Sequence, residues 1–234
     1  MNAPLHLKYR PSCFEEIVGN SGTISSLSSI LHRREGSPHA FLFVGPSGTG
    51  KTTLARIIKQ SLKCSDTDFQ ELNVANTRGI DTIRDIVQNC RLYPIEGDVK
   101  IFLLDEAAKL TNDAQNALLK VLEDTPKHVY IILCTTDPEK LLNTVKTRCT
   151  TFQLQKLINK DMISLLKRVI DSEGIDNFPD KGIEEIVKAL QEDAIISVAI
   201  PPGITLSAAG IGPSGPVSVF GSTITYSKGY GVIQ

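Results

Sequence analysis

The stretch FLFVGPSGTGKTTLARII, residues 41–58, decides the fold of this chain. Its centre, Gly45–Thr52, matches the pattern G-x-x-x-x-G-K-[ST], a glycine-rich turn whose backbone N–H groups surround phosphate oxygens. The four apolar residues before the turn predict a buried strand, and the six residues after it continue at helical period. A strand, a glycine turn and a helix N-terminus in this order predict a site for a nucleoside triphosphate and magnesium rather than an accidental glycine turn.

The composition is that of an ordinary globular protein, with 41% hydrophobic and 22% charged residues among 234. The 25 basic and 26 acidic residues nearly cancel, so a DNA role would need local patches or partner subunits. The sequence shows no signal peptide and no apolar run of membrane-spanning length, which predicts a cytoplasmic protein without a membrane partner. The cysteines lack the spacing of metal ligands and are expected to be reduced structural thiols: Cys13, Cys64, Cys90, Cys134 and Cys149.

A second site is predicted where the apolar run 99–104 ends in Asp105 and Glu106. An apolar strand with an acidic pair at its C-terminal end is the Walker B arrangement, which places a carboxylate beside the magnesium of a phosphate loop. We expect Asp105 to hold the metal, directly or through water, and Glu106 to orient and activate the attacking water. Alone, such a pair is more often a solvated turn, but its place after the phosphate loop favours the metal site.

The other apolar segments alternate between short strands and helical patterns. This alternation predicts an α/β fold, in which a mainly parallel sheet lies between helices and the nucleotide binds at the C-terminal edge of the strands. Thr136 follows the apolar run 129–134 and is a candidate contact for the γ-phosphate, although threonines also end strands without a function. The remaining predicted elements are helices at 23–31, 80–87 and 112–123, strands at 71–74 and 151–154, and a polar turn at 76–80.

The composition changes twice after the last of these strands. Residues 156–194 contain two amphipathic helical patterns, 161–170 and 183–190, joined by a loop rich in Gly, Pro and Asp. Residues 195–234 contain a single charged residue, Lys228, and short β-prone pieces that alternate with glycine turns. These changes predict a small helical unit followed by a tail of a different kind.

Four segments together resemble the tau/gamma subunit of the bacterial DNA polymerase III clamp loader: YRPSCFEEIVGN, PHAFLFVGPSGTGKTTLAR, NTRGIDTIRDI and the stretch from KIFLLDE to VKTRC. Phage clamp loaders and the small subunits of replication factor C share much of this pattern. The resemblance runs from Leu7 to Leu154 and implies an AAA+ P-loop NTPase fold. It divides the chain into an ATPase domain at 1–155, a partial helical lid at 156–194 and an atypical Gly/Ser-rich tail at 195–234.

The resemblance implies an ATPase subunit that binds ATP and Mg2+ and helps to place a sliding clamp on primed DNA during replication. Its expected partners are other clamp loader subunits, the clamp and the backbone of primer–template DNA, for which Lys109 and Arg84 are candidate contacts. ATP lies between subunits in such machines, so Arg148 is expected to act on the neighbour's γ-phosphate. The implied catalytic residues are Lys51, Glu106, Thr136 and Arg148, the metal ligands are Thr52 and Asp105, and the nucleotide contacts are Tyr9, Arg10, Pro11, Val18, Gly19, Gly45, Pro46, Ser47, Gly48, Thr49, Gly50, Lys51, Thr52 and Thr53.

Three features depart from the family pattern. The family usually inserts a four-cysteine zinc module after the phosphate-loop helix, whereas only Cys64 stands there in this chain, so zinc is not expected. The last arginine is Arg168, which leaves no counterpart of the family's sensor 2 arginine, and a tail with a single charged residue stands after Ala194, where the family continues into a collar domain. A truncated ATP-binding interaction module with little hydrolysis is therefore an alternative. A P-loop ATPase of another pathway, such as Holliday-junction branch migration, fits the YRP and TRC elements less well.

Overall fold

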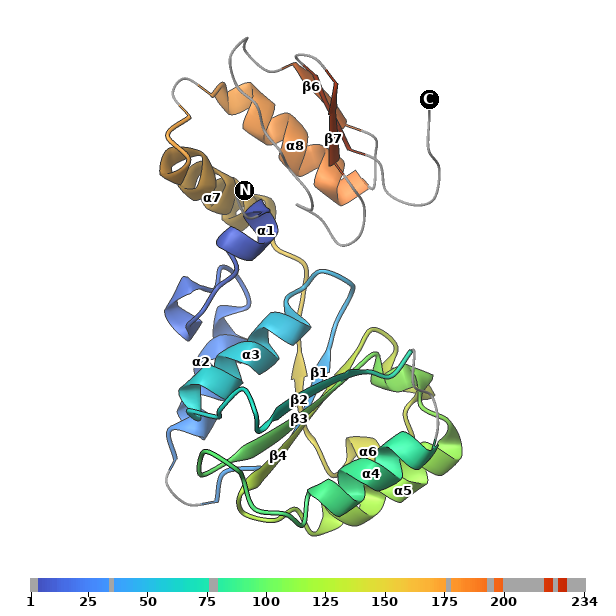
Figure 1. The fold of residues 1–234 in the computed structure, drawn as a ribbon. Coiled ribbons are helices and arrows are strands. Elements are labelled where there is room, and N and C mark those ends of the chain that lie inside the picture. The colour runs from blue at the N-terminus through green and yellow to red at the C-terminus, as the bar shows by residue number, and fades with distance from the viewer. Residues whose placement is uncertain are drawn as a thin grey trace. The chain divides into compact units, whose positions relative to one another are not determined.

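The computed structural model of the chain describes residues 4–33, 36–75, 80–175, 178–192, 196–199, 217–220 and 223–226 (Figure 1). Residues 76–79 of the predicted polar turn lie outside the described residues. The chain divides into two compact units, of which one is Pro11–Lys156 and the other combines Met1–Arg10 with Leu157–Gln234. The domain boundaries expected at 155 and 194 stay predictions, and residues 1–10 group with the second unit rather than with the first.

A five-stranded parallel sheet forms the centre of the first unit, in the order β2-β3-β4-β1-β5. In this arrangement β1 lies between β4 and β5, and β3 lies between β2 and β4. All strands run parallel, so their C-terminal ends share one edge, where Val44 pairs with Thr135 and Asn73 pairs with Asp105. This confirms the predicted α/β class. The strands are β1 (Ala40–Val44), β2 (Phe69–Asn73), β3 (Lys100–Asp105), β4 (Val129–Thr135) and β5 (Thr150–Gln153).

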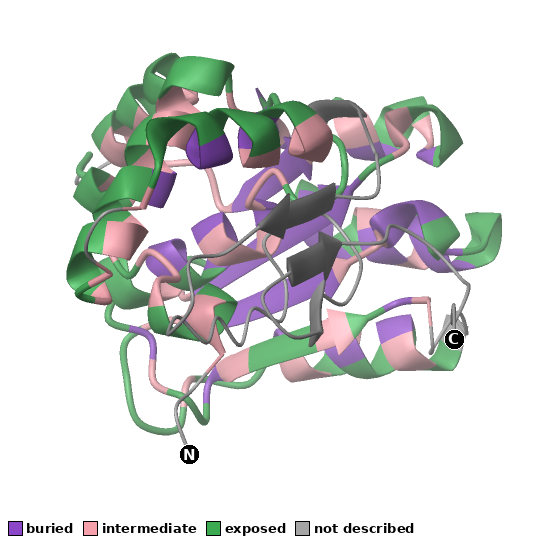
Figure 2. Ribbon diagram, turned by 90° about the horizontal axis from the view of Figure 1, so that it is seen from above, coloured by how far each residue is buried: buried purple, intermediate pink, exposed green. Residues whose placement is uncertain are grey.

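Helices cover both faces of this sheet. Successive residues of a strand point to opposite faces, so an apolar strand such as β1 places side chains under both helical layers. Phe41 and Phe43 of β1 pack in the cluster that includes α2 (Ser21–Leu31) and α3 (Lys51–Ser61). Ala40 and Leu42 pack in the opposite cluster. Figure 2 shows that the buried residues are concentrated in the strands and on the inner sides of the helices. The opposite cluster contains residues of α4 (Ile80–Asn89), α5 (Asn112–Glu123) and α6 (Asn143–Lys146), and short 3-10 turns are η1 (Phe14–Glu16), η2 (Ala107–Lys109) and η3 (Pro138–Lys140).

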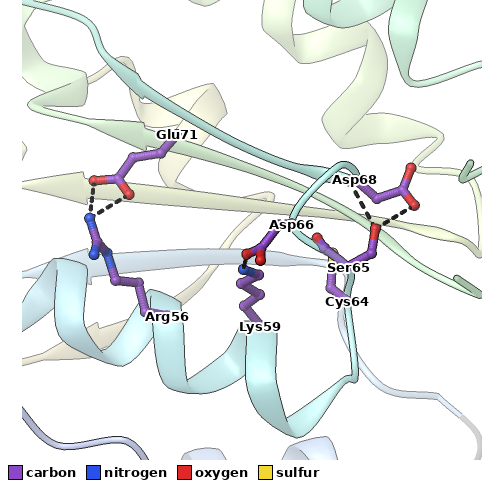
Figure 3. A network of polar contacts seen from close by, with 7 residues as sticks. All are labelled: Arg56, Lys59, Cys64, Ser65, Asp66, Asp68 and Glu71. Carbon is purple, nitrogen blue, oxygen red and sulfur yellow. Dashed lines mark hydrogen bonds and ion pairs between the residues drawn. The ribbon is translucent and has the colours of Figure 1, made fainter. Parts of the chain in front are cut away.

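Ion pairs link the phosphate-loop helix α3 to the segment that leads into β2 (Figure 3). Arg56 donates to both carboxylate oxygens of Glu71, at 2.8 and 3.1 Å, and Lys59 pairs with Asp66. These pairs are partly exposed, so each is expected to contribute only about 0–1 kcal/mol to stability. They nevertheless join α3 to the edge strand of the sheet.

Asp68, by contrast, is a buried carboxylate with 1% of its surface exposed. Its oxygens accept hydrogen bonds from the backbone N–H groups of Ile95 and Glu96, at 2.7 and 3.0 Å, and from the Ser65 hydroxyl at 2.9 Å. Burial opposes the charge of Asp68, but the backbone and hydroxyl donors outweigh this and lower its pKa. Asp68 therefore ties the loop before β3 to the start of β2.

The second unit contains α1 (Leu5–Lys8), α7 (Asn159–Ser172) and α8 (Asp180–Glu192). The sequence predicts an extended segment before Pro11, but this segment contains the helical turn α1, which starts after Pro4. Lys8 pairs with Glu173 at 2.8 Å. Buried apolar residues join α7 and α8, and a small antiparallel sheet has the order β6-β8-β7, from β6 (Ile196–Ala199), β7 (Val217–Phe220) and β8 (Thr223–Tyr226).

Among the described residues, no helix has the length and apolar character needed to cross a membrane.

Candidate nucleotide-binding site

The phosphate loop connects β1 to α3 at the C-terminal edge of the sheet, as its sequence predicts. Its first glycine is bound to the neighbouring strand, because the Gly45 N–H donates to the Thr135 carbonyl oxygen at 3.2 Å. A Cβ at Gly45 would lie 2.5 Å from the Leu154 carbonyl oxygen, so no larger residue fits without a backbone shift. Gly50, at the start of α3, has φ 91°, in the left-handed region that favours glycine. Both glycines are thus required by the backbone of the loop, Gly45 by its close neighbour and Gly50 by its positive φ.

Lys51 places its ammonium in the centre of the loop. The residue is 7% exposed, and its Nζ donates to the carbonyl oxygens of Gly45 and Pro46, both at 2.8 Å. Burial lowers the pKa of Lys51, and the nearby Cys134, Asp105 and Glu106 oppose this shift without cancelling it. A partly desolvated cation at a helix N-terminus attracts anions strongly.

Thr52 and Asp105 meet beside this ammonium. The Thr52 hydroxyl donates to one carboxylate oxygen of Asp105 at 2.9 Å, and the Glu106 N–H donates to the other at 2.9 Å. The two contacts fix the Asp105 carboxylate at both oxygens. The sequence predicted that these residues act together although they are 53 positions apart, and the structure brings them into contact.

This pair offers two oxygen atoms to a metal ion. The Thr52 hydroxyl and the Asp105 carboxylate are within hydrogen-bond distance of each other, so a single ion could contact both. A hydroxyl and one carboxylate, completed by phosphate and water oxygens, form a ligand set that Mg2+ commonly uses. Within the described residues, no group of three or more His, Cys, Asp or Glu side chains has the arrangement of a metal site.

Glu106 follows Asp105 in a strained backbone conformation. Its φ of 56° and ψ of 41° lie in the left-handed region, which is rare for residues with a side chain. Such conformations persist where the surrounding structure holds them and are found often at functional sites. The turn at Glu106 ends β3 and begins η2.

Thr136 is exposed immediately after β4, at the edge of the sheet that carries the phosphate loop. Its neighbour Thr135 is fully buried, and the Thr135 hydroxyl accepts a hydrogen bond from the Asp137 N–H at 3.0 Å. The structure therefore assigns the structural role to Thr135 and leaves Thr136 at the surface. A contact of Thr136 with nucleotide stays a prediction.

Arg148 makes its contacts with α5 and α6. Its Nη1 donates to the Thr144 carbonyl oxygen at 2.8 Å, and its Nη2 pairs with the Glu123 carboxylate. Within the described part of the chain, neither contact involves the phosphate loop. This placement is compatible with an action outside the chain's own site. The sequence reasoning did not identify Glu123, because nothing local marks a contact between residues 25 positions apart.

Gln115 is a second residue that the sequence reasoning did not identify. It is 1% exposed, donates from Nε2 to the carbonyl oxygens of Leu110 and Lys140, both at 3.2 Å, and accepts from the Leu142 N–H at 2.8 Å. It thereby joins α5 to the segment that precedes α6. The signal was a polar residue within the apolar face of the 112–123 pattern.

The residues expected near the adenine belong to both units. Tyr9 and Arg10 lie in the second unit, whereas Pro11, Val18 and Gly19 lie in the first. A hydrogen bond with Glu173 raises the pKa of Tyr9. In the first unit, the side chain of the adjacent Asn20 forms two hydrogen bonds with the backbone of Gln155, at 2.8 and 3.0 Å. Adenine contact stays a prediction for all five residues.

Four of the cysteines are buried, and none of the five forms a disulfide. Burial raises the pKa of Cys64 to about 11 and the pKa values of Cys90 and Cys149 to about 12. It also raises the pKa of Cys134, which lies on β4 close enough to Lys51 for their charges to interact. Burial therefore favours the neutral thiol form of these four cysteines.

Comparison with known proteins places these features in one family. The profile of the family described as "DNA polymerase III, delta subunit" matches residues 68–158, and that described as "Sigma-54 interaction domain" matches residues 17–80. DNA polymerase III subunit tau of Bacillus subtilis is 31% identical over 204 residues, which are 78% of this chain and 36% of that protein. DNA polymerase III subunit gamma of Buchnera aphidicola (subsp. Schizaphis graminum) is 32% identical over 200 residues, 76% of this chain and 54% of that protein. The chain thus spans about a third to a half of the length of these relatives.

Solved structures show the same fold. The Holliday junction branch migration motor RuvB of Thermotoga maritima aligns with a TM-score of 0.63 at 22% identity, over 78% of this chain and 60% of that chain. A DNA polymerase III gamma subunit-related protein of Thermotoga maritima aligns with a TM-score of 0.52 at 22% identity, over 72% and 60%. The relatives found by sequence are 31% and 32% identical to the chain, more than the 22% of these structures, so the family is assigned from the sequence relatives. The chain is a relative of the tau and gamma subunits of bacterial DNA polymerase III and has an AAA+ P-loop NTPase fold.

Proposed function

We propose that the chain binds ATP with Mg2+ and hydrolyses it as a subunit of a clamp loader. The observation that carries the proposal is the contact between Thr52 and Asp105, at 2.9 Å, beside the buried ammonium of Lys51. This contact joins the phosphate-loop helix to the acidic end of β3 and brings together a hydroxyl and a carboxylate, oxygen ligands that Mg2+ commonly uses. The relatives in replication indicate which ATPase machine such a site would serve.

The residues of the loop would bind and orient the triphosphate. Backbone N–H groups of the loop after Pro46 and at the start of α3 would bind phosphate oxygens, and Lys51 would exchange its two carbonyl contacts for the β- and γ-phosphates. Thr52 and Asp105 would hold the metal. When bound, Mg2+ supplies charge that balances the phosphate oxygens.

Glu106 would orient and activate the attacking water. Glu106 follows directly after Asp105, and its backbone N–H donates to the Asp105 side chain, which holds the Asp105 carboxylate next to the Glu106 backbone. General-base catalysis requires a carboxylate within hydrogen-bond reach of the water, and such groups contribute about 10²–10⁴-fold to rate. We propose that Thr136, at the end of β4, contacts the γ-phosphate or the same water.

Arg148 would complete a neighbouring subunit's site. An arginine supplied by another subunit can raise the rate of phosphoryl transfer by about 10³–10⁵-fold. Arg148 is held within its own chain by Glu123 and Thr144, so an isolated chain is expected to bind ATP but to hydrolyse it slowly. This supports, for the isolated chain, the second candidate function of an ATP-binding interaction module.

The proposed partners are other clamp loader subunits, the sliding clamp and primer–template DNA. DNA contacts would be made to the backbone, where cations position the protein without reading sequence. Lys109 is exposed on η2 and is a candidate contact. Arg84 is also exposed but pairs with Asp81 at 3.1 Å, which makes it the weaker candidate.

The proposal is tested by separating ATP binding from hydrolysis. Lys51→Ala should abolish binding of a fluorescent ATP analogue, whereas Glu106→Gln should retain binding and lose hydrolysis. Wild-type hydrolysis should rise on addition of primed DNA, a clamp and partner subunits. Equal hydrolysis by the wild-type chain and both variants would refute the assigned site. Size-exclusion chromatography with ATP, and hydrolysis measured at each oligomeric state, distinguishes the assembled ATPase from the binding module.

A further inference from the structure

The guanidinium of Arg148 is held by two separate elements of its own chain. Its Nη1 donates to the carbonyl oxygen of Thr144, on α6, at 2.8 Å. Its Nη2 donates to the carboxylate of Glu123, the last residue of α5. Contacts at both terminal nitrogens restrict rotation of the planar group, so the orientation of Arg148 is set before any ligand arrives.

These two contacts leave room for a phosphate. An arginine side chain carries five N–H donors, and each contact uses one donor on a different terminal nitrogen. The Arg148 side chain is 33% exposed, so it is not enclosed by its own chain. Phosphate oxygens can therefore be bound while both existing contacts are retained.

The pair between Glu123 and Arg148 is poorly placed to stabilise the fold. The Glu123 side chain is 52% exposed, and ion pairs at such positions contribute little because water and salt screen them. An arginine that is already oriented, in contrast, loses less conformational freedom when it binds phosphate. The small contribution of the pair to stability and the smaller entropy loss of an oriented arginine both favour a role for Glu123 in orienting Arg148.

We propose that Glu123 is a positioning residue that orients Arg148 toward the γ-phosphate of the neighbouring subunit's ATP. This inference rests on the proposed function, in which Arg148 acts on a neighbouring subunit. Loss of Glu123 lets the guanidinium rotate, and immobilising one such side chain changes a rate by about 2- to 10-fold. The opposite role, in which Glu123 withholds Arg148, would require release of the contact, and the remaining donors make release unnecessary.

The test compares Glu123→Ala, Glu123→Gln and Arg148→Ala in the full chain, assembled with partner subunits, clamp and primed DNA. Glu123→Ala should lower kcat for ATP about 2- to 10-fold and leave KM unchanged. Glu123→Gln should lower kcat less, because the amide oxygen still accepts a hydrogen bond. Arg148→Ala should lose nearly all hydrolysis. The matched control is Asp124→Asn, which removes the neighbouring exposed charge and should keep the wild-type kcat.

A mixing experiment separates orientation of Arg148 from a general structural defect. Subunits with Glu106→Gln cannot hydrolyse ATP but carry an intact Glu123 and Arg148. Their addition to Glu123→Ala subunits should restore kcat per active site toward the wild-type value, because they supply oriented arginines to the defective subunits' sites. A defect within the Glu123→Ala subunit's own ATP site would not be restored.

Each outcome is decisive. An inactive Arg148→Ala together with wild-type or raised kcat in Glu123→Ala overturns the positioning role and leaves the proposed function intact. A changed KM, or a lack of rescue in the mixture, likewise overturns it. If turnover does not depend on Arg148, both the positioning role and the action of Arg148 between subunits are overturned, whereas ATP binding to the wild-type loop still tests the nucleotide site.

Discussion

The backbone of Glu106 allows a stability prediction that is independent of catalysis. Its φ of 56° and ψ of 41° cost a residue with a Cβ about 1–2 kcal/mol relative to glycine. Glycine avoids this cost, but it also makes the unfolded chain more flexible, which lowers the free energy of unfolding by about 0.4–1 kcal/mol. Replacing Glu106 by Gly or by Ala removes the carboxylate in both cases, so the two variants differ only in the Cβ. The difference between these terms is about 0–1.6 kcal/mol, so we expect Glu106→Gly to be more stable than Glu106→Ala by about 0.8 kcal/mol.

Thermal unfolding followed by circular dichroism measures this difference. In a protein of this size, 1 kcal/mol shifts Tm by about 2–4 °C, so the glycine variant should unfold about 1–4 °C higher. Both variants should lack ATP hydrolysis, since both lack the proposed base.

The control pair is Lys120→Gly and Lys120→Ala, at an exposed position within α5. Glycine in a helix interior is less stable than alanine by about 0.8–1.0 kcal/mol, so the order should be reversed there. If Glu106→Gly is also less stable than Glu106→Ala, the left-handed backbone assigned to Glu106 is wrong, and with it the argument that this turn is strained.

The other predictions concern the first unit. Gly45→Ala should destabilise it by about 1–3 kcal/mol in urea unfolding, because the new Cβ would lie 2.5 Å from the Leu154 carbonyl oxygen, whereas Gly22→Ala, with nothing within 4 Å, should be neutral or stabilising. Asp68→Asn should lower the free energy of unfolding by about 1–3 kcal/mol. The amide NH2 group of asparagine would replace one carboxylate oxygen and would face a backbone N–H donor, to which it cannot bond. The pKa of Asp68 is lower in the folded state, so its stabilisation is fully present above the unfolded-state value of about 3.9 and is lost as pH falls through the folded-state value. Unfolding of wild type and Asp68→Asn should therefore converge as pH falls below about 4, and a constant difference would refute the assignment.

Local signals predicted most of the first unit. The apolar run before Gly45 had to be buried, and two-sided burial explains why β1 lacks alternation: Phe41 and Leu42 face opposite helical layers. The pattern at 112–123 gave the bounds of α5, whose N-terminus is capped by the Thr111 side chain. Contact between Thr52 and Asp105 followed because parallel strands bring both motifs to one edge.

Features that depend on tertiary contacts escaped prediction. The prediction of an extended segment before Pro11 was wrong at α1, because a single helical turn is too short to give a periodic sequence signal. Nothing in the local sequence around Glu106 requires positive φ, because its strain is imposed by the turn after β3. The buried Asp68 appeared only as one acidic residue in a polar segment, although its role comes from a loop 27 residues further along.

The contacts of Arg148 show why one chain is not expected to be a complete catalyst. The groups proposed to bind phosphate and magnesium come from the loop after β1, from α3 and from β3 of the same chain, and Thr52 and Asp105 are already in contact. Arg148 is oriented by α5 and α6, through contacts that do not include the loop. Under the proposed function, ATP binding would depend on residues within one subunit, whereas rapid hydrolysis would require a second subunit to bring its arginine to the γ-phosphate. Such a division would make the rate of hydrolysis report assembly, while the affinity for ATP reports the loop alone.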